Sequence, residues 1–169
     1  MRGIAESISR SGPGSIAGVN GGVEVLQLAV AMEQTGLDFY QALASACDDD
    51  AVASLCRRLA KEEEKHRLTF RKMLENVLGP GQGVRMTEEQ MRAALRLAKS
   101  QTLPETAKVR EVALSGKLKD ALALAIGMEQ DAILFYGRMR AFVPGADAAL
   151  AAIIEEEKGH LRALTALAV

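Results

Sequence analysis

The sequence has few aromatic side chains: it contains no tryptophan, four phenylalanines and two tyrosines among 169 residues. A core built from it must therefore be mainly aliphatic, and its abundant alanine and leucine favour helices over sheets. No run of about 18 apolar residues is present, which argues against a transmembrane helix, and the N-terminus lacks the apolar stretch of a signal peptide. We therefore expect a soluble, cytoplasmic protein without a membrane partner.

Cysteine is also scarce. Cys47 and Cys56 are the only two, and they do not form a Cys-x-x-Cys pair, so one chain cannot build a four-thiolate zinc or iron site. Two unpaired thiols are typical of a protein from a reducing compartment. The formal net charge is -1, and the lysines and arginines are dispersed along the sequence. This charge pattern gives no indication of a nucleic-acid partner.

Breaks in the helical pattern divide the chain. Residues 1–22 are rich in glycine and serine and predict a mobile or extended N-terminal arm, whereas residues 23–169 suffice for one helical domain. Within this domain, apolar residues recur at steps of three and four in four long segments. The predicted helices cover about residues 23–46, 52–77, 118–140 and 147 onward.

The connections between these segments predict the topology. Asp48-Asp49-Asp50 supplies cap residues for the second helix directly after the first, so the two helices form an antiparallel hairpin. A long connection follows, with a short helix opened by Thr87-x-x-Gln90 and continuing to about Lys99, and a further helical stretch starting at Pro104. The fold class is therefore all-α: a four-helix bundle of two antiparallel hairpins joined by a long, partly helical crossover.

One pattern occurs twice, about 95 residues apart: a glutamate in the middle of an apolar helical stripe, then Glu-x-x-His. A carboxylate buried in such a stripe would cost several kcal/mol without a partner, so Glu33 and Glu129 require compensation. A glutamate and a histidine three residues apart share a helix face and can reach one point. The copies are Met32-Glu33-Gln34 with Glu62-Glu63-Glu64-Lys65-His66, and Met128-Glu129-Gln130 with Glu156-Glu157-Lys158-Gly159-His160.

The doubled pattern predicts a dinuclear metal site, because it is the ligand set of di-iron and di-manganese helical bundles. A single Glu-x-x-His is more often an ordinary core histidine, but two copies account for six residues at once. Four carboxylates and two neutral imidazoles carry a charge of about -4, which two divalent cations cancel. We expect two iron ions per chain, although manganese or zinc could occupy the same site. The predicted metal ligands and catalytic residues are Glu33, Glu63, His66, Glu129, Glu157 and His160.

Within this set we assign the bridging role to Glu63 and Glu157, a terminal role to the two stripe glutamates, and one histidine to each metal. Without metal, burial and mutual repulsion should raise the pKa of all four carboxyl groups. Tyr40 and Tyr136 each lie seven residues after a stripe glutamate. Each tyrosine is either a plain core aromatic or a hydroxyl hydrogen-bonded to a ligand carboxylate.

The two Glu-Glu-x-x-His motifs and the two stripe glutamates resemble those of the ferritin-like superfamily, in particular rubrerythrin-like proteins without a rubredoxin domain. The resemblance covers residues 23–168. It implies a ferritin-like fold, a di-iron site formed by the six ligands above, and an oxidoreductase that reduces hydrogen peroxide or dioxygen. Because this sequence has no cysteine-ligated iron domain, the electrons would come from a separate donor protein.

One departure from this resemblance leaves an alternative open. Rubrerythrins have a further ligand glutamate where this sequence has Ala132. The remaining six ligands are equally similar to those of bacterioferritin, although Glu64 stands where a haem-ligating methionine would be expected. The alternative is a ferroxidase or iron-handling protein, and a third reading, a bundle without metal, leaves the buried carboxylates unexplained. The residues after Glu157 are too few for the fifth helix of cage-forming ferritins, which favours a homodimer.

Overall fold

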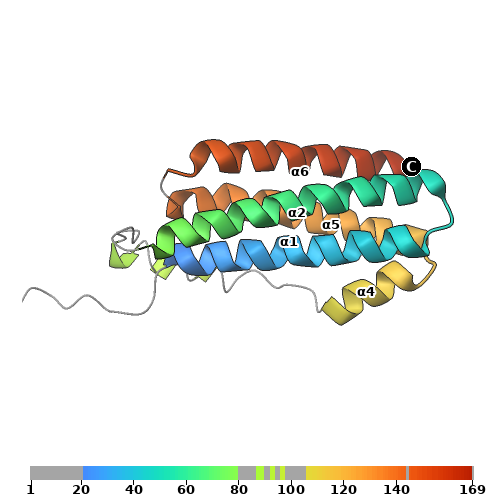
Figure 1. The fold of residues 1–169 in the computed structure, drawn as a ribbon, viewed down its shortest axis with the longest axis horizontal. Helices are drawn as coiled ribbons and strands as arrows, with labels where there is room; N and C mark the ends of the chain where they lie inside the picture. Colours follow the sequence, from blue (N-terminus) through green and yellow to red (C-terminus); the bar gives the residue numbers. More distant parts are fainter. Residues whose placement is uncertain are drawn as a thin grey trace, which may run out of the picture.

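The computed structural model describes residues 21–79, 87–89, 92–93, 96–97, 106–143 and 145–168. In these residues every regular element is a helix. Four long helices lie side by side along one direction, and a shorter helix lies against the outside of the first (Figure 1). The helices are α1 (Gly21–Ala46), α2 (Asp50–Leu78), α4 (Thr106–Leu114), α5 (Leu118–Met139), the 3-10 turn η1 (Arg140–Phe142) and α6 (Asp147–Leu167).

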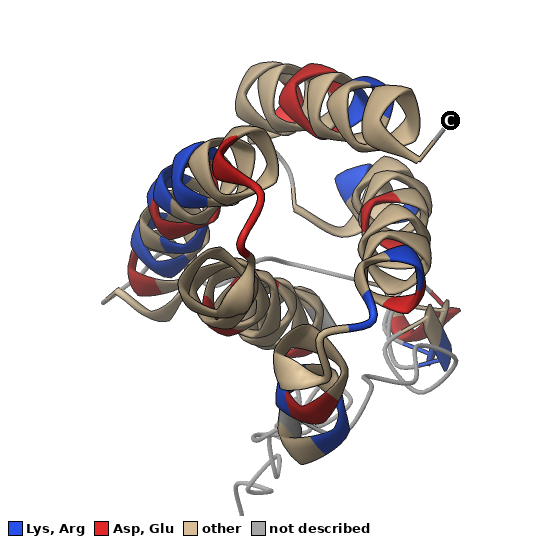
Figure 2. Cartoon of the chain, turned by 90° about the vertical axis from the view of Figure 1, so that its right-hand side faces the viewer, with Lys and Arg blue, Asp and Glu red and all other residues tan. Residues whose placement is uncertain are grey.

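This arrangement confirms the predicted all-α four-helix bundle of two hairpins. Viewed end-on, the four long helices surround a shared interior (Figure 2). None of the described helices is both long and apolar enough to cross a membrane.

The predicted boundaries differ from the observed ones mainly at the start. Gly21 and Gly22 belong to α1 and not to the arm, because the first turn of a helix tolerates glycine better than its interior does. The rest of the predicted arm, residues 1–20, lies outside the described residues. The short helix predicted from Thr87 to Lys99 lies partly outside them, but the described positions 88–89, 92–93 and 96–97 are helical. Pro104 also lies outside, and the helical stretch predicted there is observed as α4.

The turn between α1 and α2 is short and capped. Residues 47–49 connect the two helices, and the Asp49 side chain accepts hydrogen bonds from the backbone N–H groups of Ala51 and Val52. An aspartate at this position satisfies donors that have no partner within the helix. The cap therefore fixes where α2 begins.

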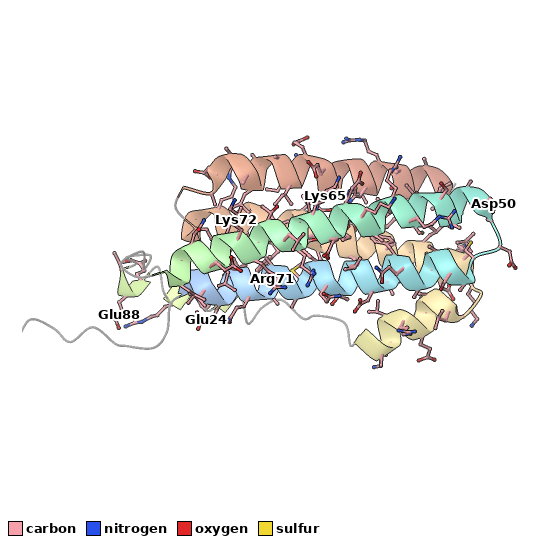
Figure 3. All side chains as sticks on the ribbon, in the orientation of Figure 1. Glu24, Asp50, Lys65, Arg71, Lys72 and Glu88 are labelled. Carbon is pink, nitrogen blue, oxygen red and sulfur yellow. The ribbon has the colours of Figure 1, made fainter. Side chains whose placement is uncertain are left out.

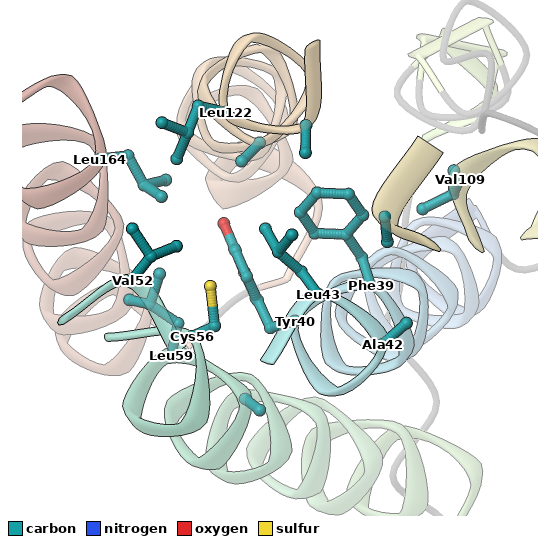
Figure 4. Close-up of a cluster of buried hydrophobic side chains, with 14 of the residues drawn as sticks. Phe39, Tyr40, Ala42, Leu43, Val52, Cys56, Leu59, Val109, Leu122 and Leu164 are labelled. Atoms are coloured by element: carbon teal, nitrogen blue, oxygen red, sulfur yellow. The ribbon is translucent and has the colours of Figure 1, made fainter. Parts of the chain in front are cut away.

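Two apolar clusters fill the bundle. The first contains Phe39, Leu43, Leu59 and Leu122, and is drawn in Figure 4. The second contains Leu26, Phe70, Phe135 and Leu150. Along each long helix, members of one cluster are followed by members of the other, and a short polar interval separates them. The bundle therefore holds a polar layer between two apolar ends.

Candidate metal centre

The six residues predicted as ligands make up this polar layer. Glu33 comes from α1, Glu63 and His66 from α2, Glu129 from α5, and Glu157 and His160 from α6. Their exposed fractions are all between 1% and 4%. Because glutamate is rarely buried without compensation, four buried glutamates in one layer indicate that positive charge is required there.

The six side chains form two overlapping groups. One group is Glu33, Glu63, His66 and Glu157, and the other is Glu63, Glu129, Glu157 and His160. Within each group, one ligand atom from every residue lies within 4.8 Å of the others. Glu63 and Glu157 belong to both groups. Each of the other residues belongs to one, so every group has one stripe glutamate and one histidine of its own.

Both histidines direct the same ring nitrogen toward the carboxylates. Nδ1 of His66 lies 2.9 Å from Glu157 Oε1 and 3.7 Å from Glu33 Oε2. Nδ1 of His160 lies 2.9 Å from Glu157 Oε2 and 3.3 Å from Glu63 Oε1. The two rings are stacked, with centroids 5.8 Å apart. Nδ1 is therefore the nitrogen of each imidazole that could bind a metal ion.

The other ring nitrogen of each histidine contacts a glutamate that is not among the six predicted ligands. Nε2 of His66 is 2.7 Å from Glu156 Oε2, and Nε2 of His160 is 2.9 Å from Glu62 Oε2, although without hydrogen-bond alignment. Each of these contacts crosses from α2 to α6. A carboxylate on the outer nitrogen fixes the orientation of a metal-binding imidazole. The signal in the sequence was the doubled Glu-Glu, in which each glutamate directly precedes a predicted ligand.

The two tyrosines also connect opposite hairpins. The Tyr136 hydroxyl on α5 donates a hydrogen bond to Glu33 Oε1 on α1, at 2.5 Å. The Tyr40 hydroxyl on α1 donates to Glu129 Oε1 on α5. Burial raises the pKa of both hydroxyls well above the usual value, and the nearby carboxylates act in the same direction. Both tyrosines therefore stay protonated as donors and hold the stripe glutamates in place.

The pKa shifts of the buried carboxyl groups differ in direction. Burial raises the pKa of Glu63 well above its usual value, with repulsion from Glu33 adding to the effect. Burial also raises the pKa of Glu129, to about 7, against the opposing effect of the nearby His160 imidazole. At Glu157 burial acts in the same direction, but the close imidazoles of His160 and His66 outweigh it and lower the pKa to about 2. The prediction that burial raises the pKa of all four carboxyl groups is therefore wrong for Glu157.

The histidines explain this difference. Burial favours the neutral imidazole of His66, but the carboxylates of Glu157 and Glu33 outweigh it and raise the pKa to about 10. The pKa of His160 is raised as well, because the nearby carboxylates of Glu129, Glu157 and Glu63 outweigh its burial. The charge of about -4 predicted for the six residues assumes neutral imidazoles, as a metal would require. When protons take the place of metal, the same imidazoles are cations and Glu157 is the anion between them.

The hydrogen bonds of the six residues show whether their oxygen and nitrogen atoms are free to bind a metal ion. Most buried polar atoms in folded proteins have a hydrogen-bond partner. Among the described residues, the buried atoms without one belong almost entirely to this layer, and several converge within hydrogen-bonding distance without donor–acceptor alignment. Oxygen and nitrogen atoms that converge on one point, with no hydrogen-bond donor directed at them, suit divalent metal ions as ligands. The atoms are Glu33 Oε2, Glu63 Oε1, His66 Nδ1, both carboxylate oxygens of Glu157, and both ring nitrogens of His160.

One position in each hairpin distinguishes the two halves of the layer. Gly36, three residues after Glu33, faces Glu63 so closely that an added Cβ would lie 3.3 Å from Glu63 Oε2. The corresponding position after Glu129 is Ala132, which is buried. Its methyl group offers no ligand atom, so the layer holds four glutamates and not five.

Comparison with known proteins agrees with this geometry. The sequence profile of the family described as Rubrerythrin matches residues 24–168, which is most of the chain. The chain therefore belongs to the rubrerythrin family, and the ferritin-like fold predicted from the motifs is confirmed. Membership implies a metal site, and the buried carboxylates and histidines form a cluster suited to one. No curated protein and no solved structure matches the chain.

Proposed function

We propose that this member of the rubrerythrin family is a non-haem di-iron oxidoreductase that reduces hydrogen peroxide with electrons from a separate donor protein. The observation that carries the proposal is the pair of overlapping four-residue groups, which share Glu63 and Glu157. Each group could hold one ion, and the two shared carboxylates would serve both ions. A single divalent ion would leave two of the four buried carboxylate charges uncompensated.

In this proposal each half of the layer holds one ion. Glu33 and His66 serve one, Glu129 and His160 serve the other, and the shared glutamates lie between them. Two ferrous ions bound there would supply the two electrons that reduction of one peroxide requires. Iron is the metal we propose, because oxygen-rich ligation with one imidazole per ion suits it.

The surrounding residues of the chain prepare the site. The tyrosine hydroxyls hold one oxygen of each stripe glutamate, which leaves the second oxygen for an ion. Glu156 and Glu62 contact the outer nitrogens of the two imidazoles, so that Nδ1 faces the carboxylates. The two apolar clusters exclude water from both ends of the layer, which strengthens electrostatic interactions inside it.

A second candidate function is ferroxidase or iron handling without peroxide turnover. The observation that favours it is the alanine at position 132, because the layer then has the ligand set of four glutamates and two histidines that iron-oxidising bundles also use. Both candidates use the same six residues, so they differ in the oxidant and in the fate of the iron.

Anaerobic stopped-flow mixing distinguishes the two candidates. The protein is loaded with two ferrous ions per chain and mixed separately with hydrogen peroxide and with dioxygen, and oxidation is followed by absorbance. The proposed function requires faster reaction with peroxide and renewed turnover only when a reductant is added. Faster reaction with dioxygen, together with donor-independent accumulation of many ferric ions per chain, would establish iron handling in its place.

A further inference from the structure

The outer face of α2 carries a continuous basic stripe. Arg58, Lys61, Lys65, Leu68 and Lys72 follow one another at steps of three and four, so they lie on one face of the helix. All five side chains are exposed, and Leu68 is 51% exposed. We call these five residues the basic ridge. Lys65 and Lys72 extend from α2 in Figure 3, and basic residues follow the outer side of this helix in Figure 2.

The cations of the ridge are not held in ion pairs within the described part of the chain. None of its four cations forms an ion pair there, whereas neighbouring Arg67 makes two hydrogen bonds to the carboxylate of Glu64. The basic residues look dispersed in the sequence, but helical periodicity collects them on one surface. A third of the chain's 21 lysines and arginines are on α2, namely Arg57, Arg58, Lys61, Lys65, Arg67, Arg71 and Lys72.

An open groove of about 790 Å³ runs beside the ridge, between α1 and α2. Small and apolar side chains, including Leu37, Ala44 and Ala60, line it. Arg57 and Lys61 border it on α2, while its α1 side carries neutral residues such as Gln41. Because Glu64 is already paired with Arg67, the groove has an apolar floor and one positive wall.

We propose that the basic ridge and this groove dock an acidic one-electron carrier protein. This carrier would be the electron donor of the reaction proposed above, so the inference rests on that function. Charge complementarity selects an acidic partner and accelerates its association. Exposed Leu68 and the groove floor supply the apolar contact that a specific interface needs at its centre. The other face of α2 carries Glu63 and His66, so the docked carrier lies one helix diameter, about 10–12 Å, from the site.

Other occupants fit this surface less well. Two copies of the chain docked through their ridges would bring like charges together, which is destabilising. A nucleic acid is usually bound by a protein with an excess of positive charge, whereas this chain has a net charge of -1. The homodimer expected from the sequence would therefore use a different surface.

The electron balance requires two visits by such a carrier. Reduction of one hydrogen peroxide takes up two electrons and two protons and releases two water molecules. Two reduced carriers each lose one electron in the process, and the protons come from solvent. Since each oxidised carrier must leave before the next binds, the complex should be weak and salt-sensitive.

Binding and electron transfer can be measured separately with one probe, a small acidic [2Fe–2S] ferredoxin of the plant type. Full-length, metal-loaded protein is titrated with oxidised ferredoxin at low and high ionic strength. The test variant combines Lys61→Glu, Lys65→Glu and Lys72→Glu. A matched control reverses three exposed cations on α5 and α6, by Lys119→Glu, Arg138→Glu and Arg162→Glu. The metal content and circular dichroism of both variants establish that they fold and load.

The expected result is that the ridge variant binds ferredoxin at least about tenfold more weakly than the wild type and loses its salt dependence. Its ferredoxin-driven turnover falls by the same factor, while its pre-reduced form reacts with peroxide at the wild-type rate. The docking surface would be wrong if the ridge variant bound ferredoxin with wild-type affinity, or if the control variant lost as much affinity as the ridge variant. It would also be wrong if the wild type did not bind ferredoxin. Tighter binding of duplex DNA than of ferredoxin would do the same. A pre-reduced wild type inert to peroxide would instead overturn the proposed function, while the binding data would still decide the docking surface.

Discussion

The two helical hairpins, α1–α2 and α5–α6, carry the same pattern on their inner faces and different residues on their outer faces. Inside, a stripe glutamate, a tyrosine, a shared glutamate and a histidine occur in the same order in both. Outside, α2 presents the basic ridge, whereas α6 presents Glu155 and Glu156. The inner faces meet at the two overlapping groups of possible metal ligands, so the same residue types recur on them. The outer faces do not converge on a shared group, so their residues can differ, and on α2 they form the surface that we propose for docking.

The hairpins also depend on each other at the layer. Each tyrosine donates to the stripe glutamate of the other hairpin, and each histidine has its outer nitrogen next to a glutamate of the other hairpin. Neither hairpin can therefore organise its half of the site alone. The symmetry is incomplete, because Glu156 is 57% exposed while Glu62 is 31% exposed, and Gly36 corresponds to Ala132.

The largest expected effect tests whether the two shared glutamates are equivalent. Glu63→Ala and Glu157→Ala should each reduce metal content from two ions per chain to nearly none, because each carboxylate serves both groups. Glu33→Ala and Glu129→Ala should each leave about one ion. Elemental analysis after anaerobic loading with ferrous iron gives the counts. If Glu63→Ala or Glu157→Ala retained two equivalents, the bridging assignment would be wrong.

The next effect concerns the protonation of the layer in metal-free protein. The pKa values of Glu129 and His66 are raised to about 7 and about 10, so the folded state binds these protons more tightly than the unfolded state does. Their contribution to stability is complete below the unfolded values and is lost as pH rises through about 7 and about 10. The contribution of Glu157 to stability depends on pH in the opposite direction, since it is lost only as pH falls through about 2.

The melting temperature of metal-free protein should therefore fall by several degrees between pH 5 and pH 9. With two equivalents of zinc the trend should reverse, because protons compete with the metal as pH falls. Thermal melts at pH 5, 7 and 9, with chelator and with zinc, measure both slopes. Glu129→Gln is the control, because it should flatten the metal-free curve near pH 7. A metal-free protein that gained stability across this range would refute the assigned protonation states.

The outer glutamates give a smaller effect that compares the hairpins directly. Glu62→Gln and Glu156→Gln should each weaken metal binding by roughly 10- to 100-fold, because each carboxylate orients the imidazole of the opposite hairpin. The loss should be larger for Glu62, which is less exposed and therefore less screened. Competition with a chromophoric chelator measures both affinities. Glu155→Gln, in which an exposed carboxylate paired with Lys158 is changed, should leave affinity unaltered, and an equal loss there would contradict the orienting role.

The sequence predicts features that lie within one helix better than contacts between helices. The helices could be predicted because apolar residues recur at steps of three and four, and the six clustered residues because their pattern occurs twice. The glutamates that contact the outer nitrogens of His66 and His160 could not be predicted. Glu62 and Glu156 each lie four residues before a histidine of their own helix, but each contacts the histidine of the other helix. The lowered pKa of Glu157 was missed for a related reason, because it depends on two imidazoles from different helices.

The smallest expected effect compares Gly36 with Ala132, the small residues that follow each stripe glutamate by three positions, and separates stability from metal binding. Gly36→Ala replaces glycine inside a helix, which should stabilise metal-free protein by about 0.5–1 kcal/mol. The new methyl group would press on Glu63 Oε2, so the shared carboxylate must shift by a few tenths of an ångström and metal affinity should fall severalfold. Ala132→Gly should do the reverse, with a melting temperature lower by a few degrees and unchanged metal affinity, because the alanine methyl group supplies no ligand atom. Thermal melts with chelator and metal titrations of both variants give the four values. If Gly36→Ala bound metal as tightly as the wild type, the close approach of α1 to Glu63 would be ordinary helix packing and not a requirement of the metal centre.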